Sequence, residues 1–149
     1  RVASIHAALG SNRVIIEAPV ADYRQHLEGY QGIDVALDPF PYAGGTTTCE
    51  ALWMGVPVVT MCGDRYVAHM GESILSTIGQ SEWVAADADG YVALARDLAA
   101  DPQGLSRSRS ELRRRFVGSP MCDSVGFARE FERAVRGMWR AWCEAPAGR

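Results

Sequence analysis

Four short apolar runs, separated by stretches with helical periodicity, constrain the fold of this chain more than any other feature. The runs are RVIIEA (13–18), IDVALD (33–38), VPVVTM (56–61) and WVA (83–85). Strands that are apolar throughout are typical of a parallel sheet buried on both faces, with helices as the crossovers between strands. The pattern therefore predicts an α/β fold, a Rossmann-like, doubly wound parallel sheet in three layers.

The helical stretches complete this arrangement. We expect helices over 2–9, 21–30, 45–54, 67–79, 89–101, 105–116 and 123–142. The last two follow each other without a strand, so the 149 residues are expected to form a single domain with an α/β part over about 1–101 and a helical annex over about 102–143. Because the chain opens on a helical pattern, we expect the domain to be truncated at its N-terminus. The stripe from Phe127 to Trp142 has helical spacing and predicts a core-facing side.

Composition excludes several classes of function. A formal net charge of −3 argues against nucleic acid or an anionic membrane as the main partner. No apolar run reaches the roughly 20 residues of a membrane span. The cysteines, at 49, 62, 122 and 143, form no C-x-x-C pair, and no histidine has zinc-finger spacing. We therefore expect reduced, structural cysteines, no metal site and a cytoplasmic location. The chain has no lysine, so any lysine that the chemistry needs must come from elsewhere.

The stretch YAGGTTTCEALWMGVPVV (42–59) carries the candidate ligand site. In an open parallel sheet, ligands bind beyond the carboxyl ends of the strands, where the next helix begins. Gly44 and Gly45 let backbone N–H groups approach a ligand, and the first turn of the following helix offers unpaired donors and a positive dipole end. Thr46 and Thr47 add hydroxyl donors to the same pole. The alternative is a simple turn with Thr46 as the N-cap.

Glu50 lies one turn deeper in the same expected helix. A carboxylate there does not help to bind a phosphate, but it can accept both hydrogen bonds from a ribose diol. A diphosphate pole followed one turn later by a carboxylate favours nucleotide recognition over a solvent-facing helical glutamate. The stretch is neither a Walker A loop, because no lysine follows, nor a G-x-G-x-x-G motif.

The run EALWMGVPVV (50–59) resembles the E-x-x-x-x-G-x-P-V-V element of GT-B glycosyltransferases. The longer string DVALDPFPYAGGTTTCEALWMGVPVVT (34–60) resembles the C-terminal catalytic half of the O-linked N-acetylglucosamine transferase family, in its bacterial and Spindly-like forms. The resemblance covers about 12–142. It implies the C-terminal, donor-binding domain of a GT-B enzyme, whose last helix often crosses back onto the N-terminal domain.

The resemblance also assigns site residues. It places the diphosphate-binding turn on Gly45, Thr46 and Thr47, although animal members have a histidine at the position of Gly45, and it places the ribose carboxylate on Glu50. The uracil segment falls on 18–21, with backbone hydrogen bonds from Ala21. His26 matches a histidine packed near the base, and Tyr23 stands where the family has a lysine.

Three further residues follow strand ends and are candidates to line the pocket: Asp38, Arg65 and His69. For Arg65 the alternative is a surface ion pair, and for His69 a structural role. No catalytic residue is assigned within this chain, since the family's candidate bases lie in the N-terminal half or the cleft.

The resemblance implies inverting transfer of N-acetylglucosamine from UDP-GlcNAc to a serine or threonine of a protein or peptide, with no metal cofactor. The expected partners within the whole protein are the N-terminal catalytic half and tetratricopeptide repeats, and the fragment alone is expected to be inactive. Other possibilities stay open: a different UDP-sugar enzyme such as an epimerase, a fucosyltransferase with a GDP donor, a non-catalytic interaction module, or a flavodoxin-like regulator. The acceptor, the catalytic base and the oligomeric state are open as well.

Overall fold

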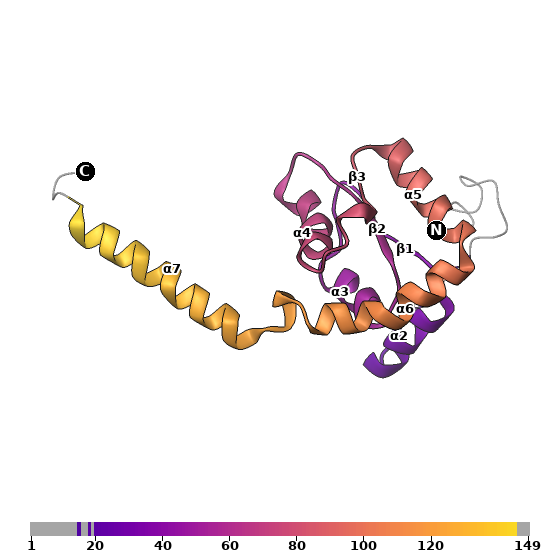
Figure 1. Ribbon diagram of the computed structural model, residues 1–149, viewed down its shortest axis with the longest axis horizontal. Coiled ribbons are helices and arrows are strands. Elements are labelled where there is room, and N and C mark those ends of the chain that lie inside the picture. Colours follow the sequence, from indigo (N-terminus) through magenta and orange to yellow (C-terminus); the bar gives the residue numbers. More distant parts are fainter. Residues whose placement is uncertain (1–14, 16–17, 19, 146–149) are drawn as a thin grey trace.

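A computed structural model of the chain describes residues 15, 18 and 20–145 (Figure 1). Its elements, in chain order, are α2 (Tyr23–Gly29), η1 (Tyr30–Gly32), β1 (Ala36–Leu37), α3 (Thr46–Trp53), β2 (Val58–Met61), η2 (Tyr66–His69), α4 (Met70–Thr77), η3 (Ser81–Trp83), β3 (Val84–Ala85), α5 (Ala88–Ala100), α6 (Pro102–Val117), η4 (Pro120–Cys122) and α7 (Ser124–Glu144). The helix and strand expected at 2–9 and 13–18 fall outside the described residues, apart from residue 15 and residue 18.

The described strands form a parallel sheet in the order β1-β2-β3. Ala36 pairs with Val58, and Thr60 pairs with Val84, so β2 is the central strand. Helices α3 and α4 pack side by side against β2, and α5 packs on β2 and β3 from the other side (Figure 1). The α/β fold with a parallel sheet is confirmed, although each described strand is shorter than its apolar run.

The core lies between β2, α3, α4 and α6. Its fully buried members include Leu52 on α3, Leu75 on α4 and Leu112 on α6. Burying each of these side chains stabilises the fold by about 1.5–3 kcal/mol. Because α6 supplies Leu112 and Phe116 to this cluster, it shares one core with the sheet.

Gly55 makes the close packing of α6 possible. Its φ of 78° lies in the left-handed region, and a Cβ there would lie 2.8 Å from the carbonyl oxygen of Arg109 in α6. The glycine therefore ends α3, lets α6 approach the turn, and returns the chain to β2.

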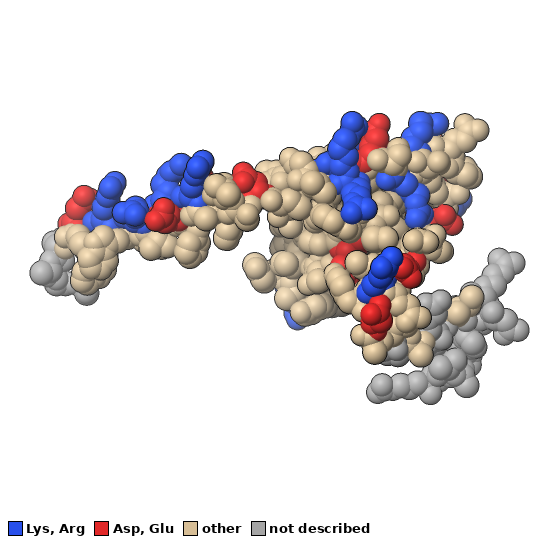
Figure 2. Space-filling view, turned by 90° about the horizontal axis from the view of Figure 1, so that it is seen from below, with Lys and Arg blue, Asp and Glu red and all other residues tan. Residues whose placement is uncertain are grey.

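The structure contradicts the prediction that the last helix, α7, turns one side toward the core. In the structure α7 extends away from the sheet and its helices (Figure 1), and none of its residues is buried. Its apolar side chains are largely exposed, with Phe127 at 69% and Trp142 at 70%. Figure 2 shows arginine and glutamate side chains along one edge of this helix and uncharged residues along the other. The periodicity correctly marks an amphipathic helix, but no described part of the chain covers its apolar face.

None of the described helices is both long and apolar enough to cross a membrane.

Candidate functional site

The turn before α3 is built around a buried carboxylate. Asp38 follows β1 and is only 4% exposed. Its Oδ1 accepts a hydrogen bond from the backbone N–H of Gly44 at 2.6 Å, and its Oδ2 accepts one from the hydroxyl of Thr60, on β2, at 2.7 Å. Burial raises the pKa of Asp38, and these two hydrogen bonds oppose that rise. The side chain thus ties the glycine turn to the central strand, and it also borders a small cavity of about 110 Å³ with Thr47 and Thr48.

The first turn of α3 presents unpaired donors. Gly45 is the N-cap, and no side chain caps the helix in the described structure. The alternative of Thr46 as a capping residue is therefore wrong, because Thr46 is the first residue of the helix itself. Thr46 and Thr47 are exposed residues of this first turn, at the pole of the helix. Such a pole attracts an anion through its donors and its dipole.

Three side chains from the segment before β1 contact the carboxylate of Glu50. Its Oε1 accepts a hydrogen bond from the hydroxyl of Tyr23 at 3.1 Å. Its Oε2 lies 3.1 Å from Nε2 of His26 and accepts a longer bond of 3.4 Å from the hydroxyl of Tyr30. The Glu50 side chain is 11% exposed. The predicted nucleoside residues Tyr23, His26 and Glu50 are therefore in contact, although Tyr23 and His26 precede Glu50 by 27 and 24 positions in the chain.

Both tyrosine hydroxyls that neighbour the carboxylate of Glu50 have a raised pKa. The hydrogen bond to Glu50 raises the pKa of Tyr23, and burial followed by the charge of Glu50 raises the pKa of Tyr30. Both hydroxyls therefore stay protonated at neutral pH and act as donors. A carboxylate has about four acceptor positions, so Glu50 keeps capacity for a further donor such as a sugar hydroxyl.

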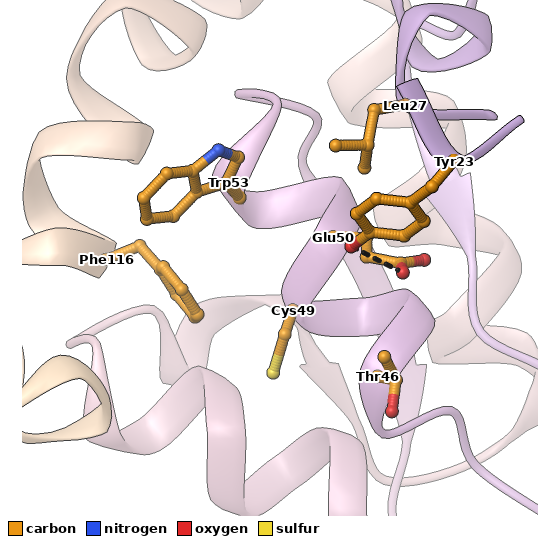
Figure 3. A pocket seen from close by; sticks show the side chains of 7 residues that line it. All are labelled: Tyr23, Leu27, Thr46, Cys49, Glu50, Trp53 and Phe116. Atoms are coloured by element: carbon orange, nitrogen blue, oxygen red, sulfur yellow. Dashed lines mark hydrogen bonds between the residues drawn. The ribbon is translucent and has the colours of Figure 1, made fainter. Parts of the chain in front are cut away.

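A cavity of about 440 Å³ opens beside this carboxylate (Figure 3). Tyr23, Thr46 and Glu50 form its polar side. The rest of its wall is apolar and comes from α2, α3 and α6: Leu27, Cys49, Trp53 and Phe116. A site with one polar side and one apolar wall suits a ligand that joins a hydroxylated group to a flat apolar one.

Aromatic contacts fix the apolar wall. Trp53 meets Phe116 edge to face with ring centroids 6.4 Å apart, and the guanidinium carbon of Arg113 lies 4.7 Å from the Trp53 ring centroid. Burial, followed by the charges of Cys122 and Glu50, raises the pKa of Cys49. Cys49 is therefore a neutral thiol in the wall rather than an activated nucleophile.

Sequence reasoning missed the four apolar wall residues and Tyr30. A local signal existed for two of them, because Thr46, Cys49, Glu50 and Trp53 share one face of α3 at helical spacing. Phe116 had no such signal, since its position depends on how α6 packs.

The other three candidates lie elsewhere. Ala21 is exposed just before the Asp22 N-cap of α2. Arg65 is exposed in the loop after β2 and has no carboxylate within 4.0 Å among the described residues, so the alternative of an ion pair there is not supported. His69 is the N-cap residue of α4, where its Nδ1 lies 2.6 Å from Oε2 of Glu72 and 3.7 Å from Sγ of Cys62.

Comparison of the chain with known proteins gives matches to one family of enzymes. The sequence model of Glycosyl transferase family 41 matches residues 2–131. The chain is 47% identical over 122 residues to the rice protein named probable UDP-N-acetylglucosamine--peptide N-acetylglucosaminyltransferase SPINDLY, covering 82% of this chain and 13% of that protein. It is 43% identical over 136 residues to the Arabidopsis thaliana protein of the same name, covering 91% of this chain and 15% of that protein.

A solved structure shows the same fold. A mutant O-GlcNAc transferase of Thermobaculum terrenum superposes with a TM-score of 0.85 at 37% identity, covering 95% of this chain and 28% of that one. The chain therefore spans only a small part of the length of these relatives. The match confirms the resemblance inferred from residues 34–60. This chain belongs to glycosyl transferase family 41.

Proposed function

We propose that this chain is the donor-binding part of an inverting glycosyltransferase that moves N-acetylglucosamine from UDP-GlcNAc to serine or threonine side chains of proteins. The observation that carries the proposal is the convergence of Tyr23 and His26 on Glu50, one turn from an uncapped helix pole. The names of the plant relatives supply the donor sugar and the peptide acceptor. The rest of the whole protein would supply the acceptor site and the catalytic base.

In this proposal the pole of α3 holds the diphosphate. The hydroxyls of Thr46 and Thr47 and the backbone N–H groups of the first turn would donate to its oxygens. As the bond to the sugar breaks, negative charge accumulates on the departing diphosphate, and oriented donors stabilise that charge without reorganising. No metal is invoked for this step, and a lysine, if one contributes, comes from another part of the whole protein.

Glu50 would accept a hydrogen bond from a ribose hydroxyl. Tyr23 and His26 would hold its carboxylate in place, and the apolar wall at Trp53 and Phe116 would border the nucleoside. Asp38 would act behind the site, because its carboxylate fixes the turn that carries Gly44.

The exposed face of α7 supports the expected partner within the whole protein. An apolar stripe with Phe127, Phe131, Trp139 and Trp142 on its surface suits burial against another domain, and we assign that role to the N-terminal catalytic half. Tetratricopeptide repeats ahead of that half and a cytoplasmic location complete the proposal. The free thiols, of which Cys122 and Cys143 are exposed, fit a reducing compartment.

Calorimetric titration with UDP tests the proposal. Replacing Glu50 by glutamine keeps the shape and removes the charge, so we expect UDP affinity to fall about 10- to 150-fold, as for loss of a hydrogen bond to a charged group worth about 1.5–3 kcal/mol. Glu28→Gln on the exposed surface of α2 is the matched control and should bind like the wild type.

Two further results bear on the proposal. Titration with GDP separates donors, and tighter binding of GDP than of UDP would favour the fucosyltransferase alternative. If the 149-residue chain gives no heat with UDP, the same two variants are compared in the full-length enzyme. Equal affinity of the Glu50→Gln variant and the wild type, with both folded, contradicts Glu50 as the ribose anchor.

A further inference from the structure

Cys62, His69 and Glu72 bring three different donor atoms together at the carboxyl end of the central strand. Cys62 directly follows β2, His69 ends η2, and Glu72 lies in the first turn of α4. Sγ of Cys62 lies 3.2 Å from Oε2 of Glu72 and 3.7 Å from Nδ1 of His69, and Nδ1 lies 2.6 Å from the same Oε2. All three donor atoms lie within 4.8 Å of one another, and each residue is partly exposed.

The geometry separates two possible uses of such a cluster. A cysteine nucleophile with a histidine base needs the thiol on one ring nitrogen and the orienting carboxylate on the other. Here Nδ1 of His69 faces both the thiol and the carboxylate, and the thiol itself donates to Glu72. The three donors therefore converge on one point instead of forming a relay, which is the arrangement that a shared cation requires.

The donor set selects the kind of cation. A thiolate, an imidazole and a carboxylate are ligands of Zn²⁺, whereas Mg²⁺ and Ca²⁺ prefer oxygen ligands alone. With Cys62 and Glu72 both anionic and His69 neutral, the ligand charge balances a divalent ion.

The spacing is close to what such an ion needs. Around tetrahedral Zn²⁺, nitrogen and oxygen ligands lie about 3.3 Å apart, and sulfur lies about 3.5–3.6 Å from either, from bond lengths of about 2.0–2.3 Å. The observed Sγ to Nδ1 distance of 3.7 Å already fits. The distances from Oε2 to Nδ1, 2.6 Å, and from Oε2 to Sγ, 3.2 Å, both have to open, by about 0.7 and 0.3–0.4 Å. The side chains of His69 and Glu72 are 44% and 36% exposed, so rotamer adjustment can supply this movement.

We propose that Cys62, His69 and Glu72 form a three-ligand site for Zn²⁺ with one open coordination position. Three protein ligands with an open fourth position are the pattern of an accessible rather than a closed structural zinc site. The site does not depend on the proposed transferase function, and the ion is not assigned to the transfer step.

Occupancy would stiffen the loop next to the candidate donor site. Cys62 and His69, on the two sides of the cluster, are joined by the segment 63–68. Within that segment the carbonyl of Val67 accepts a hydrogen bond from the backbone N–H of Ala43 at 3.2 Å, one residue before the glycine turn. A cation that links Cys62 to Glu72 would therefore hold this segment at both ends against the turn.

Cobalt substitution tests the site directly. Titration of the 149-residue chain with Co²⁺ should give, at one equivalent, the thiolate-to-metal absorption band and the strong visible bands of four-coordinate Co²⁺, both removed by Zn²⁺. Zn²⁺ should also raise the melting temperature, because it binds the folded chain. Cys62→Ser should abolish the thiolate band. His69→Gln and Glu72→Gln, at partly exposed positions that leave the core intact, should each weaken Zn²⁺ binding at least about tenfold.

Matched variants show whether the ion is held at this cluster. Cys122→Ser and Glu28→Gln change the same residue types outside it and should bind both metals like the wild type. The proposal is overturned if the thiolate band persists in folded Cys62→Ser. It is also overturned if the band disappears in Cys122→Ser, if Glu72→Gln and His69→Gln bind Zn²⁺ like the wild type, or if the wild-type chain gives no thiolate band.

Discussion

The two glycines ahead of α3 differ in the space around them, and this difference separates folding of the turn from ligand binding. A Cβ on Gly44 would lie 2.8 Å from Oγ1 of Thr47 and of Thr48, and 2.9 Å from Oδ1 of Asp38. A Cβ on Gly45 would meet only the methyl carbon of Met70, at 3.6 Å, which is ordinary van der Waals contact. Gly44→Ala should therefore destabilise the fold, and Gly45→Ala should not.

The magnitude follows from what the new methyl group displaces. Overpacking a filled site costs about 1–3 kcal/mol, and weakening the hydrogen bond from Gly44 to the Asp38 carboxylate adds about 1.5–3 kcal/mol. We expect Gly44→Ala to lower the free energy of unfolding by about 2.5–6 kcal/mol, which at about 2–4 °C per kcal/mol lowers the melting temperature by about 5–24 °C. For Gly45→Ala we expect a change within about 0.5 kcal/mol.

Thermal and urea denaturation followed by circular dichroism measure these changes. Gly29→Ala is the control, because a Cβ at that end of α2 meets no described atom within 4 Å. Calorimetry with UDP supplies the second readout: Gly45→Ala should bind UDP more weakly than the wild type while melting at the same temperature, since Gly45 is the N-cap of α3, where the diphosphate is proposed to bind. A Gly44→Ala variant that melts like the wild type refutes the steric argument, and equal destabilisation by both substitutions refutes the separation of roles.

Three other changes have defined outcomes. Leu52→Ala removes a fully buried side chain and should cost about 2–5 kcal/mol in urea denaturation, whereas a cost below this range would mean that α3 is not anchored in the core. Because burial raises the pKa of Asp38 above its ordinary 3.8, the folded state holds this proton more tightly. The contribution of Asp38 to stability is full below pH 3.8 and is lost as the pH rises through the folded pKa. In urea titrations at several pH values, the stability of the wild type relative to Asp38→Asn should therefore fall over that window. A difference that stays constant with pH contradicts the raised pKa of Asp38. Trp139→Glu changes a side chain that is 62% exposed and should leave the free energy of unfolding within about 0.5 kcal/mol, so a clear loss in a thermal melt would mean that the α7 face is buried within the chain.

The parts of the fold that the sequence predicted are those set by local periodicity. The helix from Ala88 to Ala100 and the strand from Val58 to Met61 lie where their patterns place them, because apolar spacing and capping residues are encoded within a few positions. Asp87 accepts a hydrogen bond from the N–H of Gly90, which fixes the start of α5. The single helix expected at 67–79 is instead a 3-10 turn ending at His69 followed by α4, since backbone differences of this size leave no clear mark on periodicity.

The parts that escaped prediction depend on contacts between distant segments. Helical spacing marks the apolar face of α7, but spacing alone does not say whether its partner lies in the same chain. Phe116 reaches the pocket only because α6 packs against α3, and Tyr30 reaches Glu50 from 20 positions earlier. The cluster around Cys62 has no familiar metal motif in the sequence, because its three residues follow one another at intervals of 7 and 3 positions, unlike a C-x-x-C pair or a zinc finger.

The way α2 is attached explains why the candidate site and its neighbouring helix belong together. No residue of α2 is buried, so this helix has little apolar core of its own to hold it. It is fixed instead by the contacts of Tyr23 and His26 with Glu50, while Arg109 of α6 donates a 2.6 Å hydrogen bond to the carbonyl of Ile33 in the segment that follows. Glu50 is therefore both the anchor of α2 and the candidate ribose acceptor. A ligand that hydrogen-bonds Glu50 changes the same contacts that position Tyr23 and His26, so donor binding and docking of α2 are thermodynamically linked.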